Sequence, residues 1–214
     1  MGVDAKARKD AKLETSGRIV LAAEVEFAER GFDGAGMKAI SVRANVSQAL
    51  LHYHFGSKDH LYAEVVRHRS NLINSERLAL LDAVDLNAAN AVERVLDALF
   101  RPPLGPAGGD KSYTRIFGGL VVGRERERAL VKEFYDPTAQ RFITALQTAV
   151  PALGREKAAL AYTYALGNLV VMIARDGRVE RLMGQGGLRD GEDVLQGLIT
   201  FAQGGIMALV AKGN

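Results

Sequence analysis

The histidines are the first residues of this sequence that could do chemistry. All four, His52, His54, His60 and His68, fall in one short part of the 214-residue chain. Imidazoles can bind zinc, transfer protons or contact a nucleic acid. His52 and His54 are two residues apart, which directs their side chains to different sides of a helix, and no acidic residue stands at ligand spacing from them. We therefore expect that these histidines form no metal site and instead face solvent or a nucleic acid.

Other catalytic motifs are missing or incomplete. The sequence has no cysteine nucleophile and no Gly-x-Ser-x-Gly motif. The segment GPAGGDKS at 105–112 is similar to a phosphate-binding loop, but Asp110 interrupts the required Gly-Lys pair, so we predict a flexible connector. MGQGGLRDG at 183–191 lacks the third glycine of a dinucleotide-binding turn, and RERER at 124–128 is typical of a solvated helix face. We expect neither an enzyme nor a bound cofactor.

The composition is that of a soluble globular chain. Hydrophobic residues make up 48% and charged residues 25%, and the absence of cysteine excludes disulfides and thiolate metal sites. The net charge of +3 is too small for a purely electrostatic nucleic-acid coat, although a pI near 9.2 allows a local basic surface. The polar N-terminal residues lack the apolar stretch of a secretory signal, so we expect a cytoplasmic protein.

Helices must position these residues, because proline is absent before position 102 and glycine is the only helix-breaking residue type in the first part of the chain. Residues 1–14 are predicted to be a polar flexible tail. Apolar residues at four-residue spacing then predict a helix over 16–30, which Gly31 closes.

A pair of short helices is predicted next, at about 36–55. The first covers 37–44, and Asn45 follows it in a turn, because asparagine tolerates the left-handed conformation. Ser47 is expected to cap the second helix, which ends at His54. Two packed helices joined by a short turn are the pattern of a helix-turn-helix, in which the first helix supports the second in the major groove of DNA.

The rest of the chain also follows helical spacing. Ser57 caps a long helix to about residue 84, and an apolar stripe over 92–100 ends at Arg101-Pro102-Pro103. Helical spacing resumes over 113–122 and 129–150, where Pro137 either kinks one helix or starts another. No alternating pattern of convincing length predicts a strand, so the fold class is all-α.

Two C-terminal segments, at about 155–176 and 191–212, are apolar nearly all round. Membrane spans are the competing interpretation. Polar and glycine residues within the segments argue against it, namely Thr163, Asn168, Gln196, Gly197, Thr200, Gln203, Gly204 and Gly205. An apolar helix in a small soluble protein must be covered on two sides, and a second copy can supply the second cover. We expect a homodimer through these two helices and no membrane insertion.

The residues from Arg18 to Tyr62 resemble the DNA-binding domain of the tetracycline-repressor (TetR) family. The matching positions keep the order and spacing of the family motif: Ile19, Ala22, Ala23, Phe27, Ala28, Gly31, Phe32, Ile40, Ala44, Val46, Ser47, Tyr53, Phe55, Ser57, Lys58, Asp59 and Leu61. The resemblance implies an N-terminal three-helix domain over 15–62, joined by a long helix to a larger helical ligand-binding and dimerisation domain over 63–214.

The chain departs from this family pattern at a few positions. Gly36 stands where Ser or Thr usually caps the second helix and touches a phosphate, so that contact must be absent or made by a backbone N–H. Ser41 and Asn45 replace the usual alanine and turn glycine. Glu26 precedes Phe27 where an apolar residue is common, and only an ion pair would account for it.

Helix geometry and the resemblance together suggest which residues meet DNA: Arg18, Lys38, Ser47, Gln48, Ala49, Leu50, His52, Tyr53, His54 and Lys58. Gln48 can bond an adenine through two hydrogen bonds, and Ala49 and Leu50 can meet thymine methyls. Lys58, beside a helix N-terminus, is expected to clamp a phosphate. Core packing is the preferred interpretation of Ile40, Leu51 and Phe55.

In the resembling family the middle helices enclose a ligand cavity. The candidates here are Phe100, Tyr113, Arg115, Phe117, Phe134, Phe142, Tyr164, Asn168 and Met172. The lining predicts a small, largely apolar effector. We expect a homodimeric regulator, a repressor released from a palindromic operator by that effector. The alternative is a helical ligand-binding or interaction protein that has the same fold but no sequence-specific DNA binding.

Overall fold

The computed structural model describes residues 2–109, 111–174, 177–184 and 191–211, and every regular element in these ranges is a helix. The elements are α1 (Gly2–Gly34), α2 (Met37–Arg43), α3 (Gln48–Phe55), α4 (Lys58–Asp82), α5 (Ala91–Leu104), η1 (Pro106–Gly108), α6 (Lys111–Val122), α7 (Glu125–Phe134), α8 (Asp136–Ala149), η2 (Pro151–Leu153), α9 (Gly154–Ala174), α10 (Arg178–Met183) and α11 (Gly191–Ala211). The all-α prediction is confirmed.

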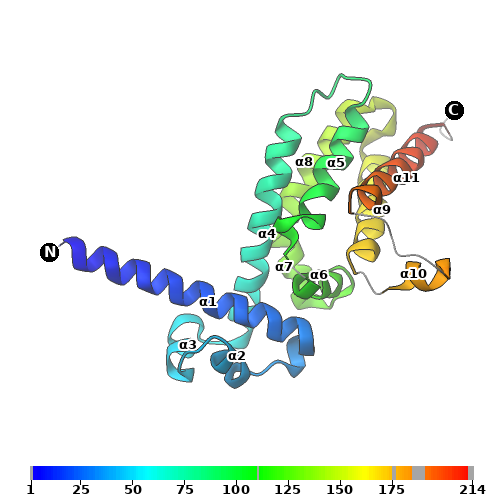
Figure 1. Cartoon of the computed structure of the whole chain (residues 1–214). Helices are drawn as coiled ribbons and strands as arrows, with labels where there is room; N and C mark the ends of the chain where they lie inside the picture. Colours follow the sequence, from blue (N-terminus) through cyan, green and yellow to red (C-terminus); the bar gives the residue numbers. More distant parts are fainter. Residues whose placement is uncertain (1, 110, 175–176, 185–190, 212–214) are drawn as a thin grey trace.

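The helices α1, α2 and α3 form a group at one end of the molecule (Figure 1). The long helix α4 leaves this group and packs against α5 and α8, while α9 and α11 lie together on the other side of α5 and α8. The helices α6 and α7 lie between the two parts, with α6 packed on α1. A signal that alters α6 or α7 therefore has a direct contact route to the N-terminal helices.

The first helix begins much earlier than predicted. The structure differs from the expectation of a flexible tail at 1–14, because α1 already begins at Gly2. The physical reason is composition: alanine, lysine and arginine dominate this segment and are strong helix formers. The predicted break at Gly31 is confirmed, since that residue has a φ of 68° and lies outside helical geometry.

The turn between α2 and α3 has the predicted local chemistry. Asn45 takes a φ of 52°, and it is the only residue other than glycine with a positive φ in the described chain. The Ser47 hydroxyl accepts a hydrogen bond from the backbone N–H of Leu50 at 3.1 Å, which caps α3. Gly36 precedes α2 without a side-chain cap. Gly36 and Ser47 thus stand at the starts of α2 and α3, and Asn45 supplies the left-handed residue in the turn between the two helices.

The proline pair does not end α5 where the sequence predicts. The helix continues through Arg101-Pro102-Pro103 to Leu104, because the prolines lie in its last turn, where few N–H groups remain to be bonded. Pro103 has no N–H to donate to the carbonyl of Leu99. The Nε of Arg77 donates to that carbonyl instead, at 3.0 Å. A side chain from α4 thus completes the end of α5.

The predicted flexible connector at 105–112 is in part a packed turn. Residues Pro106–Gly108 form η1, which packs on α4 and α5. The Nη1 of Arg69 donates to the carbonyl of Ala107 at 3.4 Å. Asp110 lies outside the described residues.

The structure decides the question at Pro137, which stands in the first turn of α8 and therefore starts a new helix. The preceding helix α7 begins at Glu125, earlier than the predicted Ala129. The carboxylate of Glu127 accepts a hydrogen bond from the backbone N–H of Arg124 at 3.0 Å, which fixes this earlier start.

Candidate nucleic-acid interface and effector core

Helix α3 has one face in the core and one face open to solvent. Leu51 is completely buried and Phe55 nearly so, and both pack with the buried Ile40 of α2. The preference for core packing at these three positions is confirmed. The opposite face exposes Gln48 and Leu50, and Tyr53 is 72% exposed. The predicted base-reading residues Ser47, Gln48, Ala49 and Leu50 therefore share the open first turn of α3.

The histidines near α3 have defined hydrogen-bonding roles. The Nδ1 of His52 donates to the carbonyl of Gly56 at 2.9 Å, since a carbonyl can only accept, and the ring stays exposed. In the same way the Nδ1 of His60 donates to the carbonyl of Phe55 at 2.9 Å. Burial, and next the charge of Lys12, lower the pKa of half-buried His54 below its ordinary value. The described residues contain no group of three side chains suited to a metal.

Lys58 is tied to its own domain. Its Nζ donates to the backbone carbonyls of Asp33 and Ala35, at 3.3 and 3.1 Å, and lies 4.6 Å from the centre of the Phe32 ring. These contacts fix the end of α1 to the start of α4. The phosphate clamp assigned to Lys58 stays a prediction, and the structure gives this residue a positioning role in addition.

Three other cations lie near the open face of α3 or on neighbouring elements. Arg18 and Lys38, predicted to contact phosphates, are both exposed. Lys12 is absent from the residues predicted from the sequence, yet its Nζ lies 5.3 Å from the centre of the Tyr53 ring. The early start of α1 brings it there. The richness of the N-terminal segment in helix formers is the signal that could have revealed it.

Glu26 has the ion pairs that would account for it. Its side chain is buried, and its oxygens lie 2.8 Å from the Nε of Arg30 and 3.4 Å from an Nη of Arg43. Arg43 ends α2 and also lies 2.8 Å from Glu29. The carboxylate of Glu26 therefore joins α1 to α2.

The RERER segment does more than face solvent, because two of its residues lie in the contact between the N-terminal helices and the rest. The guanidinium of Arg126 stacks 3.4 Å from the centre of the Phe32 ring and lies 5.4 Å from that of Tyr62. Glu127 is buried beside it. Burial, and next the charge of Glu127, raise the pKa of Tyr62 to about 12. Arg115, predicted to bind ligand, lines the groove of about 680 Å³ at this contact.

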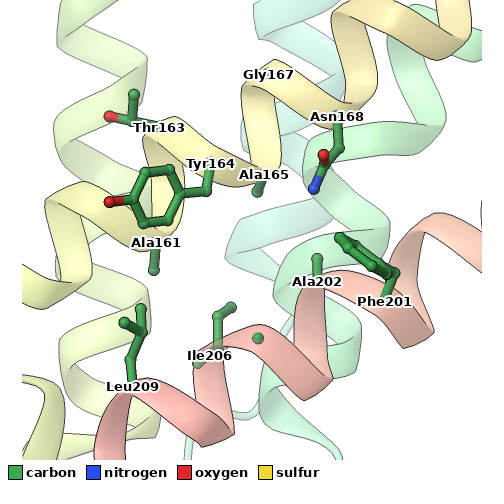
Figure 2. Close-up of a pocket in the computed structure, with 11 residues that line it drawn as sticks. Ala161, Thr163, Tyr164, Ala165, Gly167, Asn168, Phe201, Ala202, Ile206 and Leu209 are labelled. Carbon is green, nitrogen blue, oxygen red and sulfur yellow. The ribbon is translucent and has the colours of Figure 1, made fainter.

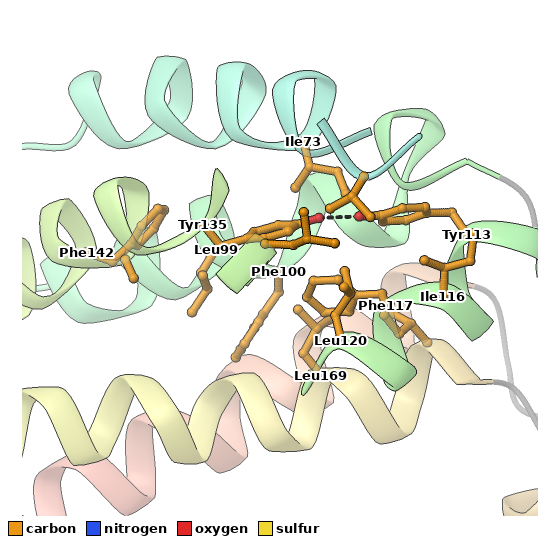
Figure 3. Packing of buried hydrophobic residues seen from close by; sticks show 14 of the residues in the cluster. Ile73, Leu99, Phe100, Tyr113, Ile116, Phe117, Leu120, Tyr135, Phe142 and Leu169 are labelled. Atoms are coloured by element: carbon orange, nitrogen blue, oxygen red, sulfur yellow. Dashed lines mark hydrogen bonds between the residues drawn. The ribbon is translucent and has the colours of Figure 1, made fainter. Parts of the chain in front are cut away.

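The predicted ligand residues do not share one cavity. Phe100, Tyr113, Phe117 and Phe142 are buried in the core between the middle helices (Figure 3). The hydroxyls of Tyr113 and Tyr135 form a hydrogen bond of 2.5 Å within this core. Half-buried Phe134 stands at the end of α7.

The remaining predicted ligand residues lie on the face formed by α9 and α11. Tyr164 and Asn168 line a hollow of about 490 Å³ between these helices, opposite Phe201 (Figure 2). Met172 and Asn168 line a second hollow of about 430 Å³, which Phe201 also borders. Tyr164 is 57% exposed and Phe201 is 71% exposed. This face is therefore an open apolar surface, distinct from the closed aromatic core.

Two polar residues of the core, Arg77 and Asn74, are absent from those predicted from the sequence. Arg77 is 1% exposed. Asn74, one turn earlier on α4, donates from Nδ2 to the carbonyl of Phe134 at 2.8 Å. A charged side chain on a buried stripe is the signal that could have identified Arg77, because Ile73 and Leu81 flank it at four-residue spacing and both are buried.

Two family models match most of the chain. The model described as bacterial regulatory proteins of the tetR family matches residues 19–65. The model described as the tetracyclin repressor-like C-terminal domain matches residues 93–205. The first match contains the helix-turn-helix, and the second contains most of the middle and C-terminal helices.

Individual relatives agree with these models. The HTH-type transcriptional activator FasR of Mycolicibacterium smegmatis is 42% identical over 73 residues, which are 34% of this chain and 33% of that protein. The matched part thus spans only about a third of that relative. The solved structure of PfmR, a TetR family transcriptional regulator from Thermus thermophilus, is 19% identical with a TM-score of 0.63, over 86% of this chain and 96% of that chain.

A further solved structure contains AibR in complex with isovaleryl coenzyme A and operator DNA. It is 17% identical to this chain, with a TM-score of 0.62, and the match covers 87% of this chain and 97% of that one. At such identities the two structural likenesses establish the fold alone.

Proposed function

The chain belongs to the TetR family of bacterial transcriptional regulators, and from this premise we propose that it is a homodimeric repressor released from a palindromic operator by a small, largely apolar effector. It is a DNA-binding regulator and not an enzyme. Members of this family are soluble DNA-binding proteins, which supports a cytoplasmic location. Two helices, Pro151–Ala174 and Gly191–Ala211, have the length and composition of membrane spans, but apolar helices of soluble proteins pass the same test.

The observation that carries the proposal is the exposed first turn of α3. Ser47 caps this turn, buried Leu51 and Phe55 fix its orientation, and Gln48 lies open in front of it. The first residues of such a helix are those that reach base edges in the major groove. A glutamine there can read adenine through its amide.

The open face of α9 and α11 supports dimerisation. Its large exposed side chains include Leu160, Tyr164, Val171, Phe201 and Met207. An apolar patch of this kind is costly in water unless a partner covers it. We propose that a second copy covers it, so that two α3 helices face one DNA duplex.

The regulation we propose is a population shift between two separations of the α3 helices. Half-sites on the same side of the duplex lie about 34–36 Å apart. An effector releases the operator only to the extent that it binds more tightly to a conformation with another separation. The buried core around Phe100 of α5 and Phe117 of α6 is where an apolar molecule would act on that balance, because α6 packs on α1.

The test is operator selection followed by release. The purified full-length chain should enrich one palindromic sequence from randomised duplexes at low salt, and no enrichment would favour the alternative of a helical protein without sequence-specific DNA binding. Reporter expression from the selected operator then gives the sign of regulation. For a repressor, we expect reporter expression to rise when the gene is deleted. Loss of expression on deletion would instead make the protein an activator, as the name of the FasR relative states for that protein.

A further inference from the structure

The core contains a positive charge for which the described residues supply no negative partner. Arg77 is almost fully buried, and its Nε donates to the carbonyl of Leu99 at 3.0 Å. Its Nη2 is buried and has no hydrogen-bond partner among the described residues. An arginine keeps its charge in proteins, so the guanidinium is a buried cation with at least one donor unused.

Among the described residues, the ionisable groups that act on the charge of Arg77 are tyrosine hydroxyls. They belong to Tyr162, Tyr135 and Tyr113. Burial raises the pKa of all three, that of Tyr135 to about 12, so none is ionised at neutral pH. Each hydroxyl can support an anion through a hydrogen bond, but none supplies the missing charge.

A second buried arginine on the same helix shows the usual arrangement. Arg69 is 8% exposed, and Glu24 of α1 accepts hydrogen bonds from its Nη2 at 2.8 Å and from its Nε at 3.2 Å. Within the part of the chain that the structure describes, one buried arginine thus pairs with a carboxylate and the other does not. Because an unpaired buried charge is strongly destabilising, the guanidinium of Arg77 marks a candidate binding site for an anion.

Arg77 borders a small cavity. Arg77 lines a space of about 10 Å³ together with Tyr113, Phe117 and Ile173. This is roughly the space that one water molecule needs. It admits a small polar group, and the apolar aromatic core next to it, with Phe100 and Phe117, is suited to a hydrocarbon chain once the helices separate.

We propose that the effector is an apolar monocarboxylic acid whose carboxylate binds Arg77. This proposal rests on the proposed function, since it names the chemical class of the effector. The carboxylate accepts from the unused Nη2, and the Tyr113 and Tyr135 hydroxyls turn toward it. The hydrocarbon tail enters between α5 and α6. Because α6 packs on α1, its displacement moves the N-terminal helices.

The experiment compares matched probes on the full-length protein. Straight and branched carboxylic acids of about four to twelve carbons are titrated by calorimetry beside the primary alcohol of each skeleton. A hydrogen bond to a charged group predicts that at least one acid binds about ten- to hundredfold more tightly than its alcohol. Arg77→Met should remove that preference, whereas Arg77→Lys should retain part of it. Folding of each variant is checked by circular dichroism.

Two results would overturn the proposal: no acid is preferred over its alcohol, or Arg77→Met keeps the preference. If Arg77→Met fails to fold, the Arg77→Lys variant tests the proposal instead. Lysine is a shorter, differently shaped cation, so an unchanged preference for the acid over its alcohol would contradict a direct contact with Arg77. Operator binding without any acid is measured in parallel. If the protein binds its operator but prefers no acid over its alcohol, this inference alone is refuted. If the protein does not bind an operator at all, the proposed function is refuted.

Discussion

The exposed ring of Phe201 offers a direct test of the proposed dimer. The residue is 71% exposed and borders both hollows on the face of α9 and α11. A phenylalanine buries on the order of 200 Å² when fully covered, so about 140 Å² of each ring is open to a partner. At about 25 cal/mol per Å², complete coverage contributes about 3.5 kcal/mol per subunit, or about 7 kcal/mol per dimer.

Phe201→Ser removes nearly all of this contribution. Each 1.4 kcal/mol is tenfold, so the dissociation constant of the dimer should rise by about 300-fold if half of the ring is covered and by about 10⁵-fold if all of it is. Sedimentation equilibrium over a series of protein concentrations measures the change, and circular dichroism confirms the fold.

Val42→Ser is the matched control for this substitution. Val42 is 72% exposed, but it lies on α2, away from the proposed interface. The control should dimerise as the wild type does. The reasoning is refuted if Phe201→Ser dissociates at the same concentration as the wild type, or if Val42→Ser weakens the dimer as much.

Other predictions concern DNA contacts and stability. Gln48→Ala should cost about 1–3 kcal/mol and relax the base preference at one position of each half-site, and an unaltered selected site would disprove direct readout. Lys38→Ala should weaken binding to all sequences and reduce the salt slope by about 0.9 per lost phosphate contact; an unchanged slope argues against that contact. Arg126→Met should lower the free energy of unfolding by about 0.5–2 kcal/mol in urea titrations, whereas exposed Arg128→Met should not. Burial, and next the charge of Arg69, lower the pKa of His68 below 6.5, so the folded state favours the neutral imidazole. The contribution of His68 to the free energy of unfolding is therefore fully present above pH 6.5 and is lost as the pH falls through the folded-state pKa. His68→Gln should therefore flatten the loss of stability between about pH 7 and pH 5, and an equally steep loss would contradict this.

The parts of the fold that the sequence predicted best depend on local backbone demands. Gly31 and Asn45 take positive φ values, and Ser47 and Ser57 accept hydrogen bonds from the first turns of their helices. Each of these effects is decided within a few residues, so a single sequence reveals it. The start of α1 was harder to predict, because the N-terminal segment contains neither a strong breaker nor an apolar stripe.

Residues whose roles depend on distant elements could not be assigned from the sequence. Lys58 looks like a free cation at a helix start, but the carbonyls of Asp33 and Ala35 occupy its ammonium only because α1 ends beside α4. Aromatic content likewise suggested one ligand cavity. Phe117 nevertheless lies in the closed core and Tyr164 on the open face of α9 and α11, since the side of a helix that faces the core is fixed by all of its neighbours.

The central claim is that two α3 helices of a dimer read one palindromic operator. Selection from randomised duplexes with the full-length protein, followed by sequencing, tests it most directly. We expect an enriched pair of inverted half-sites whose centres are one helical turn of DNA apart, or a multiple of it. Enrichment of isolated half-sites, or no enrichment at low salt, would contradict it.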